Sequence, residues 1–220
     1  MLSPAEKGYL GTLDYWSPLK PLALFYQHEL ERALARIFRR TRFSFGAGRW
    51  LEDGCGRGDF LLTLARFGAD PGRAYAIDQD IAGLDAARRR FPAAAFARAD
   101  AAALPYRAAS FDHATAATLF SSIPPGERRA RAAAELSRVL KPGGTLLWFD
   151  FVESNARTRG LEIAEVRALF PGWPATAYKF GLRFRWASIL VNKSLCFAHA
   201  LAALGVARSH WLVLLTKPPE

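Results

Sequence analysis

The sequence predicts an α/β fold in which helices cover both faces of a mainly parallel sheet. Segments with strand character alternate with segments of helical periodicity between residues 50 and 151. The segment 145–151 is apolar along nearly its whole length, which is typical of a strand buried on both faces. A length of 220 residues, 51% of them hydrophobic, suits a single domain with a sizeable core.

Each expected element follows from spacing or from a break in the chain. Apolar side chains recur at helical spacing over residues 22–40, with charges between them. A short strand at residues 50–51 enters a glycine cluster, and a Pro-Gly-Gly turn at 142–144 closes a later helix. The other expected elements before residue 152 are helices at 59–68, 81–91 and 124–140 and strands at 74–78, 94–99, 111–118 and 145–151.

The tail is expected to contain a helix at 161–170, a strand at 175–182, an apolar helical stretch at 186–205 and a last strand at 210–216. We interpret the apolar face of the helical stretch as core in the first place. A lining for an apolar acceptor, a dimer contact and a membrane-surface patch beside Lys179, Arg183 and Arg185 stay open. Polar residues interrupt the stretch, which argues against a membrane-spanning helix.

The charge and the cysteines limit the classes of function. The formal net charge is +10, but the arginines are spread along most of the chain, which favours a compositional bias over one basic face. Cys55 and Cys196 are the only cysteines and form no CxxC pair, so we expect no metal site and a reducing compartment. The first residues lack a signal-peptide pattern, and a cytoplasmic protein is expected.

The glycine cluster after the first strand is the first candidate site. Gly54, Gly56 and Gly58 allow a tight turn and let a ligand lie against bare peptide groups, with amides of the next helix facing it. The alternative is a turn that needs only flexible residues. Asp78 is the last residue of the second strand, where a carboxylate accepts ribose hydroxyls in nucleotide-binding folds. Its alternative role is a charge at a helix N-terminus.

A second carboxylate, Asp100, closes the third strand and could accept a hydrogen bond from an adenine amino group, or else cap a turn. These residues lie in three of the four segments that resemble the motifs of class I S-adenosylmethionine (SAM)-dependent methyltransferases. Leu51–Gly58 resembles their first motif, and Ala76–Asp78 resembles the acidic second motif. Ala99–Asp112 resembles the third region, and Glu135–Gly144 matches a family helix and turn almost letter for letter. NAD-binding folds carry GxGxxG instead.

The resemblance implies a three-layer Rossmann-like methyltransferase fold with a seven-stranded, mostly parallel sheet whose last strand is antiparallel. An extra apolar helical segment would lie between strands six and seven. The chain would be one SAM-dependent methyltransferase domain, with an N-terminal helical lid at 1–48, a SAM-binding core at 49–151 and acceptor-side elements at 152–220. SAM would be the cofactor and S-adenosylhomocysteine the product.

The resemblance also implies roles for single residues. Glu52 and the glycines would line the methionine portion of the cofactor, Asp78 would hold the ribose, and Gln79 would border the adenine. The expected cofactor-binding residues are Glu52, Gly54, Cys55, Gly56, Gly58, Asp78, Gln79, Asp100, Ala101 and Ala117. Two places depart from the family pattern: Asp53 stands where many members carry an apolar residue, and serines at 121–122 follow the fourth strand where a histidine is frequent.

Methyl transfer from a sulfonium needs few catalytic residues, because the donor is already activated and the protein mainly aligns the acceptor. Asp150 is the one catalytic candidate, as a group that orients or deprotonates the acceptor. A strand-end cap is the equal alternative. We interpret His113, early in its strand, as structural. Tyr15, Trp16 and Tyr26 are candidates for the lid, with plain packing as the alternative.

The absence of several motifs weakens other acceptor classes. No Asn/Asp-Pro-Pro-Tyr/Phe follows the fourth strand, and no Pro-Cys nucleophile or carboxylate cluster is present. The sequence therefore favours a small-molecule or lipid- or glycan-linked acceptor, methylated at oxygen. An RNA or protein methyltransferase and a non-catalytic SAM-fold subunit are the alternatives; nucleic acid is the less favoured partner, and monomer or homodimer stays open. The tail resembles a bacterial subgroup associated with envelope polysaccharide.

Overall fold

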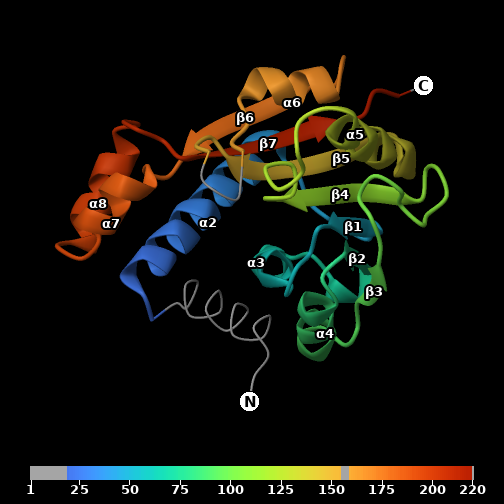
Figure 1. Cartoon of the computed structure of the whole chain (residues 1–220), viewed down its shortest axis with the longest axis horizontal. Helices are drawn as coiled ribbons and strands as arrows, with labels where there is room; N and C mark the ends of the chain where they lie inside the picture. The colour runs from blue at the N-terminus through green and yellow to red at the C-terminus, as the bar shows by residue number, and fades with distance from the viewer. Residues whose placement is uncertain (1–18, 155–158, 220) are drawn as a thin grey trace.

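Seven strands form one sheet in the order β3-β2-β1-β4-β5-β7-β6 (Figure 1). The structure is a computed structural model that describes residues 19–154 and 159–219. The strands are β1 (Trp50–Asp53), β2 (Ala74–Asp78), β3 (Ala95–Arg98), β4 (Phe111–Ala117), β5 (Leu140–Phe151), β6 (Ala175–Phe180) and β7 (His210–Thr216). The seven-stranded sheet is the predicted one.

Only β7 runs against the other strands of this sheet. It pairs antiparallel with both β5 and β6, whereas β1 to β5 pair in parallel. The prediction of an antiparallel last strand is confirmed. The carboxyl ends of β1 to β6 therefore meet at one edge of the sheet, which we call the carboxyl edge.

The helices form a layer on each face of the sheet, which confirms the three-layer fold (Figure 1). They are α2 (Pro21–Thr41), α3 (Asp59–Arg66), α4 (Ile81–Arg90), α5 (Glu127–Val139), α6 (Ile163–Leu169), α7 (Phe184–Leu190) and α8 (Leu195–Ala203). Buried residues of α2, α3 and α4 share one core cluster with the sheet. Those of α5 and α6 share the other. The strands are thus covered on both faces, as the apolar run of β5 predicts.

Most elements lie within about three residues of their predicted bounds, and two differ from the prediction for a structural reason. β5 already begins at Leu140, and its pairing with β4 shifts register between Phe111 and His113. The Pro-Gly-Gly turn at 142–144 therefore lies in an irregular part of the strand, where a proline without an N–H is tolerated. The predicted helical stretch at 186–205 is two helices, because Ser194 begins α8 by accepting a hydrogen bond from the Phe197 amide (3.2 Å).

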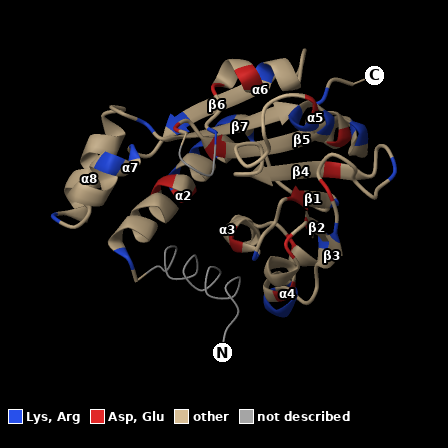
Figure 2. Cartoon of the chain, viewed as in Figure 1, with Lys and Arg blue, Asp and Glu red and all other residues tan. Residues whose placement is uncertain are grey.

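The two short helices α7 and α8 lie beyond the carboxyl end of β6 and beside α2 (Figure 1). The predicted extra helical segment between strands six and seven is therefore present. No helix among residues 19–154 and 159–219 is both long and apolar enough to cross a bilayer. Basic residues are distributed over α2, α4, α5 and α7 (Figure 2). Many are paired with acids, as Arg90 is with Asp59 and Arg128 with Asp100.

Candidate cofactor and acceptor site

The loop between β1 and α3 is built from glycines with positive φ. Gly54, Gly56 and Gly58 have φ angles of 79°, 50° and 77°. A Cβ at Gly54 would lie 2.9 Å from the side chain of Leu119, and one at Gly58 would lie 3.0 Å from that of Phe91. A Cβ at Gly56 would meet no protein atom within 4 Å. Two of the glycines are thus required by the protein itself, whereas the third borders open space.

Asp78 joins this loop to the end of β2. One oxygen of its carboxylate accepts the Gly56 amide (2.7 Å), and the other accepts the Asp80 amide (2.9 Å). The amides of Gly54 and Cys55 both donate to the Ile77 carbonyl oxygen, at 2.9 and 2.8 Å. The structure therefore brings the glycine loop and Asp78 together, as the sequence predicts. Each carboxylate oxygen retains a lone pair for a further donor.

Glu52, the residue before the last of β1, is a buried carboxyl group with an unused acceptor. Its side chain is 1% exposed, and no donor from the described residues reaches its Oε2 atom. Burial raises its pKa well above the ordinary value, and the charges of Asp59 and Asp78 add to the effect. A buried acceptor without a donor is costly. A cationic or N–H-bearing ligand at the carboxyl edge would remove that cost.

Asp53 faces the other side of the sheet and is equally buried. Its Oδ2 atom has no partner among the described residues. Burial raises its pKa to about 8, with smaller contributions from Asp78, Asp100 and Glu135. The group is therefore protonated near neutral pH. This is the position where the resemblance leads one to expect an apolar residue.

The predicted adenine-side residues lie at the carboxyl ends of β2 and β3. Asp100 accepts the Ala102 amide (2.9 Å) and forms an ion pair with Arg128 (2.7 Å). Its carboxylate thus shapes the turn, which is the second of its two expected roles. Ala101 is buried beside it, and Gln79 is exposed at the start of the loop that leads to α4.

Asp150 is fully buried at the end of β5. Its two oxygens accept the amides of Ser121 and Phe151, each at 2.9 Å. Burial raises its pKa to about 6 although these hydrogen bonds act in the opposite direction. This geometry corresponds to a strand-end cap, the alternative to direct contact with an acceptor. The carboxylate holds the loop that follows β4, and the half-buried Ala117 ends that strand.

An aromatic cluster lies next to this loop, and the sequence analysis did not identify it. We call it the aromatic wall; it consists of Tyr26, Phe149, Phe151, Phe180 and His210. The His210 ring centroid lies 4.8 to 5.5 Å from those of the other four rings. Phe149 and Phe151 are only half-buried. Register places Phe151, Phe180 and His210 side by side at the carboxyl edge, so three strands supply every ring of the wall except that of Tyr26, which belongs to α2.

His210 is a neutral member of this wall. Burial lowers its pKa to about 3, and its Nδ1 atom is hydrogen-bonded to the hydroxyl of Ser209 (2.7 Å). The ring of Phe60 in α3 stacks on that of Phe149, with centroids 6.0 Å apart. The wall therefore reaches from α2 to the helix that follows the glycine loop.

Other singled-out residues lie away from this chemistry. His113 packs against Phe43 and bonds to Thr145 (2.8 Å) near the amino end of β4, as its structural interpretation predicts. Cys55 is buried, and burial raises its thiol pKa, so it is a poor nucleophile. Tyr15 and Trp16 lie outside the described residues. In the part of the chain that the structure describes, no three His, Cys, Asp or Glu side chains are grouped to hold a metal ion.

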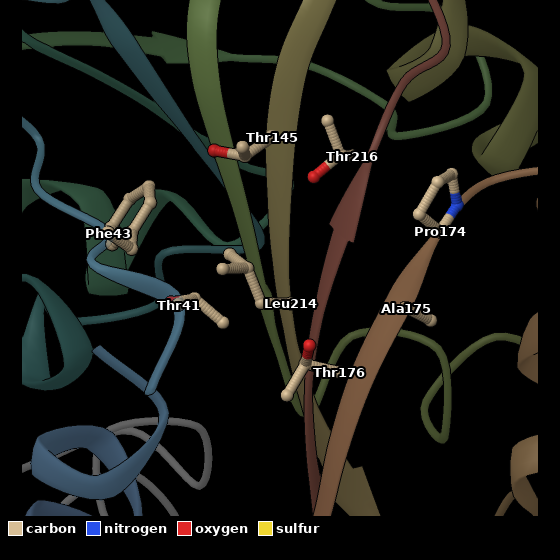
Figure 3. Close-up of a pocket in the computed structure, with 8 residues that line it drawn as sticks. All are labelled: Thr41, Phe43, Thr145, Pro174, Ala175, Thr176, Leu214 and Thr216. Atoms are coloured by element: carbon tan, nitrogen blue, oxygen red, sulfur yellow. The ribbon is translucent and has the colours of Figure 1, made fainter. Parts of the chain in front are cut away.

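A cavity of about 270 Å³ lies at the opposite edge of the sheet (Figure 3). It is formed by the end of α2, the amino ends of β5 and β6, and the end of β7. Its lining residues are Thr41, Phe43, Thr145, Pro174, Ala175, Thr176, Leu214 and Thr216. None of the predicted cofactor residues lines it, so this cavity is separate from the carboxyl-edge site.

Comparisons with known proteins agree with this geometry. Residues 51–148 match the family model described as a methyltransferase domain. No curated protein sequence matches the chain. Among solved structures, a SAM-dependent methyltransferase from Methanosarcina mazei covers 79% of this chain and 93% of its own, with 18% identity and a TM-score of 0.58. One from Mesorhizobium loti covers 81% and 95%, with 19% identity and a TM-score of 0.59.

A third similar structure is the [4+2]-cyclase SpnF, which covers 86% of this chain and 81% of its own, with 21% identity and a TM-score of 0.63. These structures share the Rossmann-like fold with the chain. The family match runs from β1 into β5 and includes every predicted cofactor residue, from Glu52 to Ala117. Residues 51–148 thus match a methyltransferase domain, for which SAM is the expected cofactor. The open space at Gly56 and the unused oxygen of Glu52 fit such a ligand.

Proposed function

We propose that this chain methylates a hydroxyl group of an apolar small molecule or of a lipid- or glycan-linked acceptor. The observation that supports the proposal is the aromatic wall, which continues the carboxyl edge from the glycine loop. An apolar acceptor packed on half-buried aromatic rings would lose water on one side. Its hydroxyl would then face the neighbouring cofactor residues.

In this proposal, the carboxyl edge has two parts with different roles: the glycine-loop side binds the cofactor, and the aromatic wall binds the acceptor. Glu52, Gly56 and Asp78 would hold the cofactor, whose sulfonium supplies an activated methyl group. The wall would align the acceptor oxygen with the donor, and alignment of this kind is the largest contribution such a protein can make. His210 is neutral and buried, so it would provide a surface rather than a charge.

Asp150 would act as a positioning residue in this scheme. It fixes the loop between the cofactor half and the wall through two amide hydrogen bonds. The acceptor hydroxyl then loses its proton to solvent after the methyl group has moved, and no early base is needed.

The distribution of charge favours this acceptor class over RNA. Basic residues occur on helices of both layers and many form ion pairs (Figure 2). An RNA-binding enzyme concentrates such charge where the phosphates lie. A glycan- or lipid-linked acceptor also agrees with the resemblance of the tail to bacterial enzymes associated with envelope polysaccharide. Two unpaired thiols, Cys55 and Cys196, support a cytoplasmic location.

The first test is calorimetry of the protein with SAM and with S-adenosylhomocysteine, repeated on Asp78→Ala. We expect binding that the variant loses. S-adenosylhomocysteine release is then measured with phenols, prenyl alcohols and glycolipids as acceptors. Release distinguishes methyl transfer from other chemistry on this fold. Absence of SAM binding, or release with RNA alone, contradicts the proposal.

Phe149→Ala tests the wall directly. We expect the KM for the acceptor to rise about tenfold or more, because a phenylalanine contact is worth about 1.5–3 kcal/mol. The SAM dissociation constant should not change. Phe43→Ala is the matched control, since Phe43 is also a half-buried ring but lies at the opposite edge. An equal effect of the two substitutions would remove the wall from the acceptor site.

A further inference from the structure

The hairpin of α7 and α8 (residues 183–208) turns small side chains inward and large apolar ones outward. Its inward residues pack with Phe25 and Tyr26 of α2; the buried ones are Ala187, Val191, Ala198 and Ala202. Six of the nine exposed large apolar side chains of the described residues belong to it: Phe184, Trp186, Ile189, Phe197, Leu204 and Val206. Such a concentration in one hairpin marks an interaction surface.

The charge of the hairpin has one sign. Residues 183–208 contain Arg183, Arg185, Lys193 and Arg208 and no acidic residue. Figure 2 shows the same absence of acidic positions on α7 and α8. Arg183 forms an ion pair with Glu153 (3.2 Å), so the excess positive charge comes from the other three.

We propose that this hairpin docks on the surface of an anionic phospholipid bilayer. Exposed Trp and Phe side chains beside Arg and Lys suit the boundary between headgroups and acyl chains, where an apolar face is buried by about 5–10 Å. Basic residues are drawn to the negative surface of such a membrane. Two copies of the chain related by a two-fold axis would instead place the same positive residues against each other.

Docking would bring the aromatic wall close to the membrane. The hairpin follows β6 directly and returns to Ser209 and His210. The Arg183 amide donates to the Ala207 carbonyl oxygen (2.7 Å), and the Tyr26 hydroxyl donates to that of Leu182 (2.7 Å). The first bond joins the two ends of the hairpin to each other, and the second joins the residue before the hairpin to Tyr26 of the wall. A lipid-linked acceptor could then be reached without leaving the bilayer, although docking itself does not depend on methyl transfer.

Vesicle sedimentation tests the proposal without an acceptor. The full-length protein is mixed with vesicles of phosphatidylcholine alone or of equal parts phosphatidylcholine and phosphatidylglycerol. We expect the protein in the pellet only with the anionic vesicles, and less of it as salt is added. Protein that stays in the supernatant, or that binds both vesicles equally, overturns the proposal.

Matched variants locate the contact. Trp186→Ser with Phe197→Ser should weaken anionic-vesicle binding about tenfold or more, because two exposed rings are lost. Leu62→Ser removes an exposed apolar side chain of α3 and should have no effect. Arg185→Ser with Lys193→Ser should also weaken binding. Arg89→Ser with Arg107→Ser removes the same charge from exposed positions elsewhere and should not.

Three readouts separate docking from folding and from self-association. Circular dichroism and SAM affinity should be the same for wild type and for the hairpin variants. In sedimentation velocity, wild type and the Trp186→Ser, Phe197→Ser variant should have the same oligomeric state. A dimer present in the wild type and lost in this variant would show that the hairpin mediates self-association. Such a dimer, or equal loss of vesicle binding in the control variants, contradicts the proposal.

Discussion

The two adjacent carboxyl groups at the end of β1, Glu52 and Asp53, lie in different surroundings. Glu52 and Asp53 are both 1% exposed, and each has an oxygen without a donor from the described residues. Successive side chains of a strand point to opposite faces. The charge of Asp78 raises the pKa of both groups, whereas Asp59 adds to the effect on Glu52, and Asp100 and Glu135 add to the effect on Asp53. Glu52 thus faces the glycine loop, where a ligand can use it. Asp53 lies where the fold needs only an apolar side chain.

Asp53→Leu should therefore stabilise the protein near neutral pH. The folded pKa of about 8 exceeds the ordinary value of 3.8, so the folded state holds this proton more tightly. Stability from this group is present below about pH 4 and is lost as pH rises toward 8, on the order of 4 kcal/mol by pH 7. Urea unfolding of wild type and variant at several pH values measures the difference. Asp53→Asn is the neutral control and should remove the same pH dependence; a difference that is constant from pH 4 to 8 would contradict this account.

Asp150→Asn should lower the melting temperature, because one of the two amides of Ser121 and Phe151 would face an NH₂ group. A loss of about 1–3 kcal/mol is expected. The shape of the pH–rate profile should stay the same, since the residue positions a loop rather than moving a proton. A profile that loses a pKa near 6 would restore the catalytic role.

The loop between β1 and α3 requires glycine for two reasons: its backbone is left-handed at three positions, and a ligand would lie close to the backbone at Gly56. Gly56→Ala should keep the fold, at a cost of about 1 kcal/mol for its left-handed backbone, and should weaken SAM binding. Gly46→Ala is the control, because the φ angle of Gly46 (51°) is almost that of Gly56 (50°). A Cβ at Gly46 would also meet no protein atom within 4 Å. Thermal melts and calorimetry compare the two. Equal SAM affinity in both variants would show that the space beside Gly56 is not the cofactor site.

The sequence predicts elements well where a local signal marks both ends. β2 and β7 have their predicted bounds, since a turn precedes each and the apolar run stops sharply. The division of the hairpin into two helices is harder to predict. Apolar residues continue between α7 and α8, and only Ser194 marks the start of α8. The early start of β5 depends on its register with β4, which is a long-range property.

At the scale of the whole molecule, the arrangement of the glycine loop with Asp78 and Asp100 was predictable, and the aromatic wall was not. The glycine loop, Asp78 and Asp100 lie at ends of successive strands, so order along the chain already brings them to one edge. The aromatic wall combines residues of α2, β5, β6 and β7. Its clue in the sequence is the alternation of Phe149 and Phe151, but only the insertion of β7 between β5 and β6 places His210 beside them.

A single domain should respond to the cofactor as one unit. At a SAM concentration of about 100 times the dissociation constant, binding contributes about 2.7 kcal/mol. For a chain of this length, the melting temperature should rise by roughly 5–10 °C in one transition. Differential scanning calorimetry measures it. Two separate transitions, with only one of them shifted, would show that the tail and the core at 49–151 unfold independently.

The position of β7 also has a consequence during synthesis. β6 is made before β7, yet it is joined to the rest of the sheet only through β7. At about 5–20 residues per second, the ribosome needs roughly 2–6 seconds to add the segment from Gly181 to Ser209. During that interval β5 presents an open edge, and β6 has no neighbouring strand. The nascent chain is then most exposed to aggregation and to chaperones. A chain that ends before residue 210 would lack β7, so β5 would remain an open edge and β6 would remain unpaired.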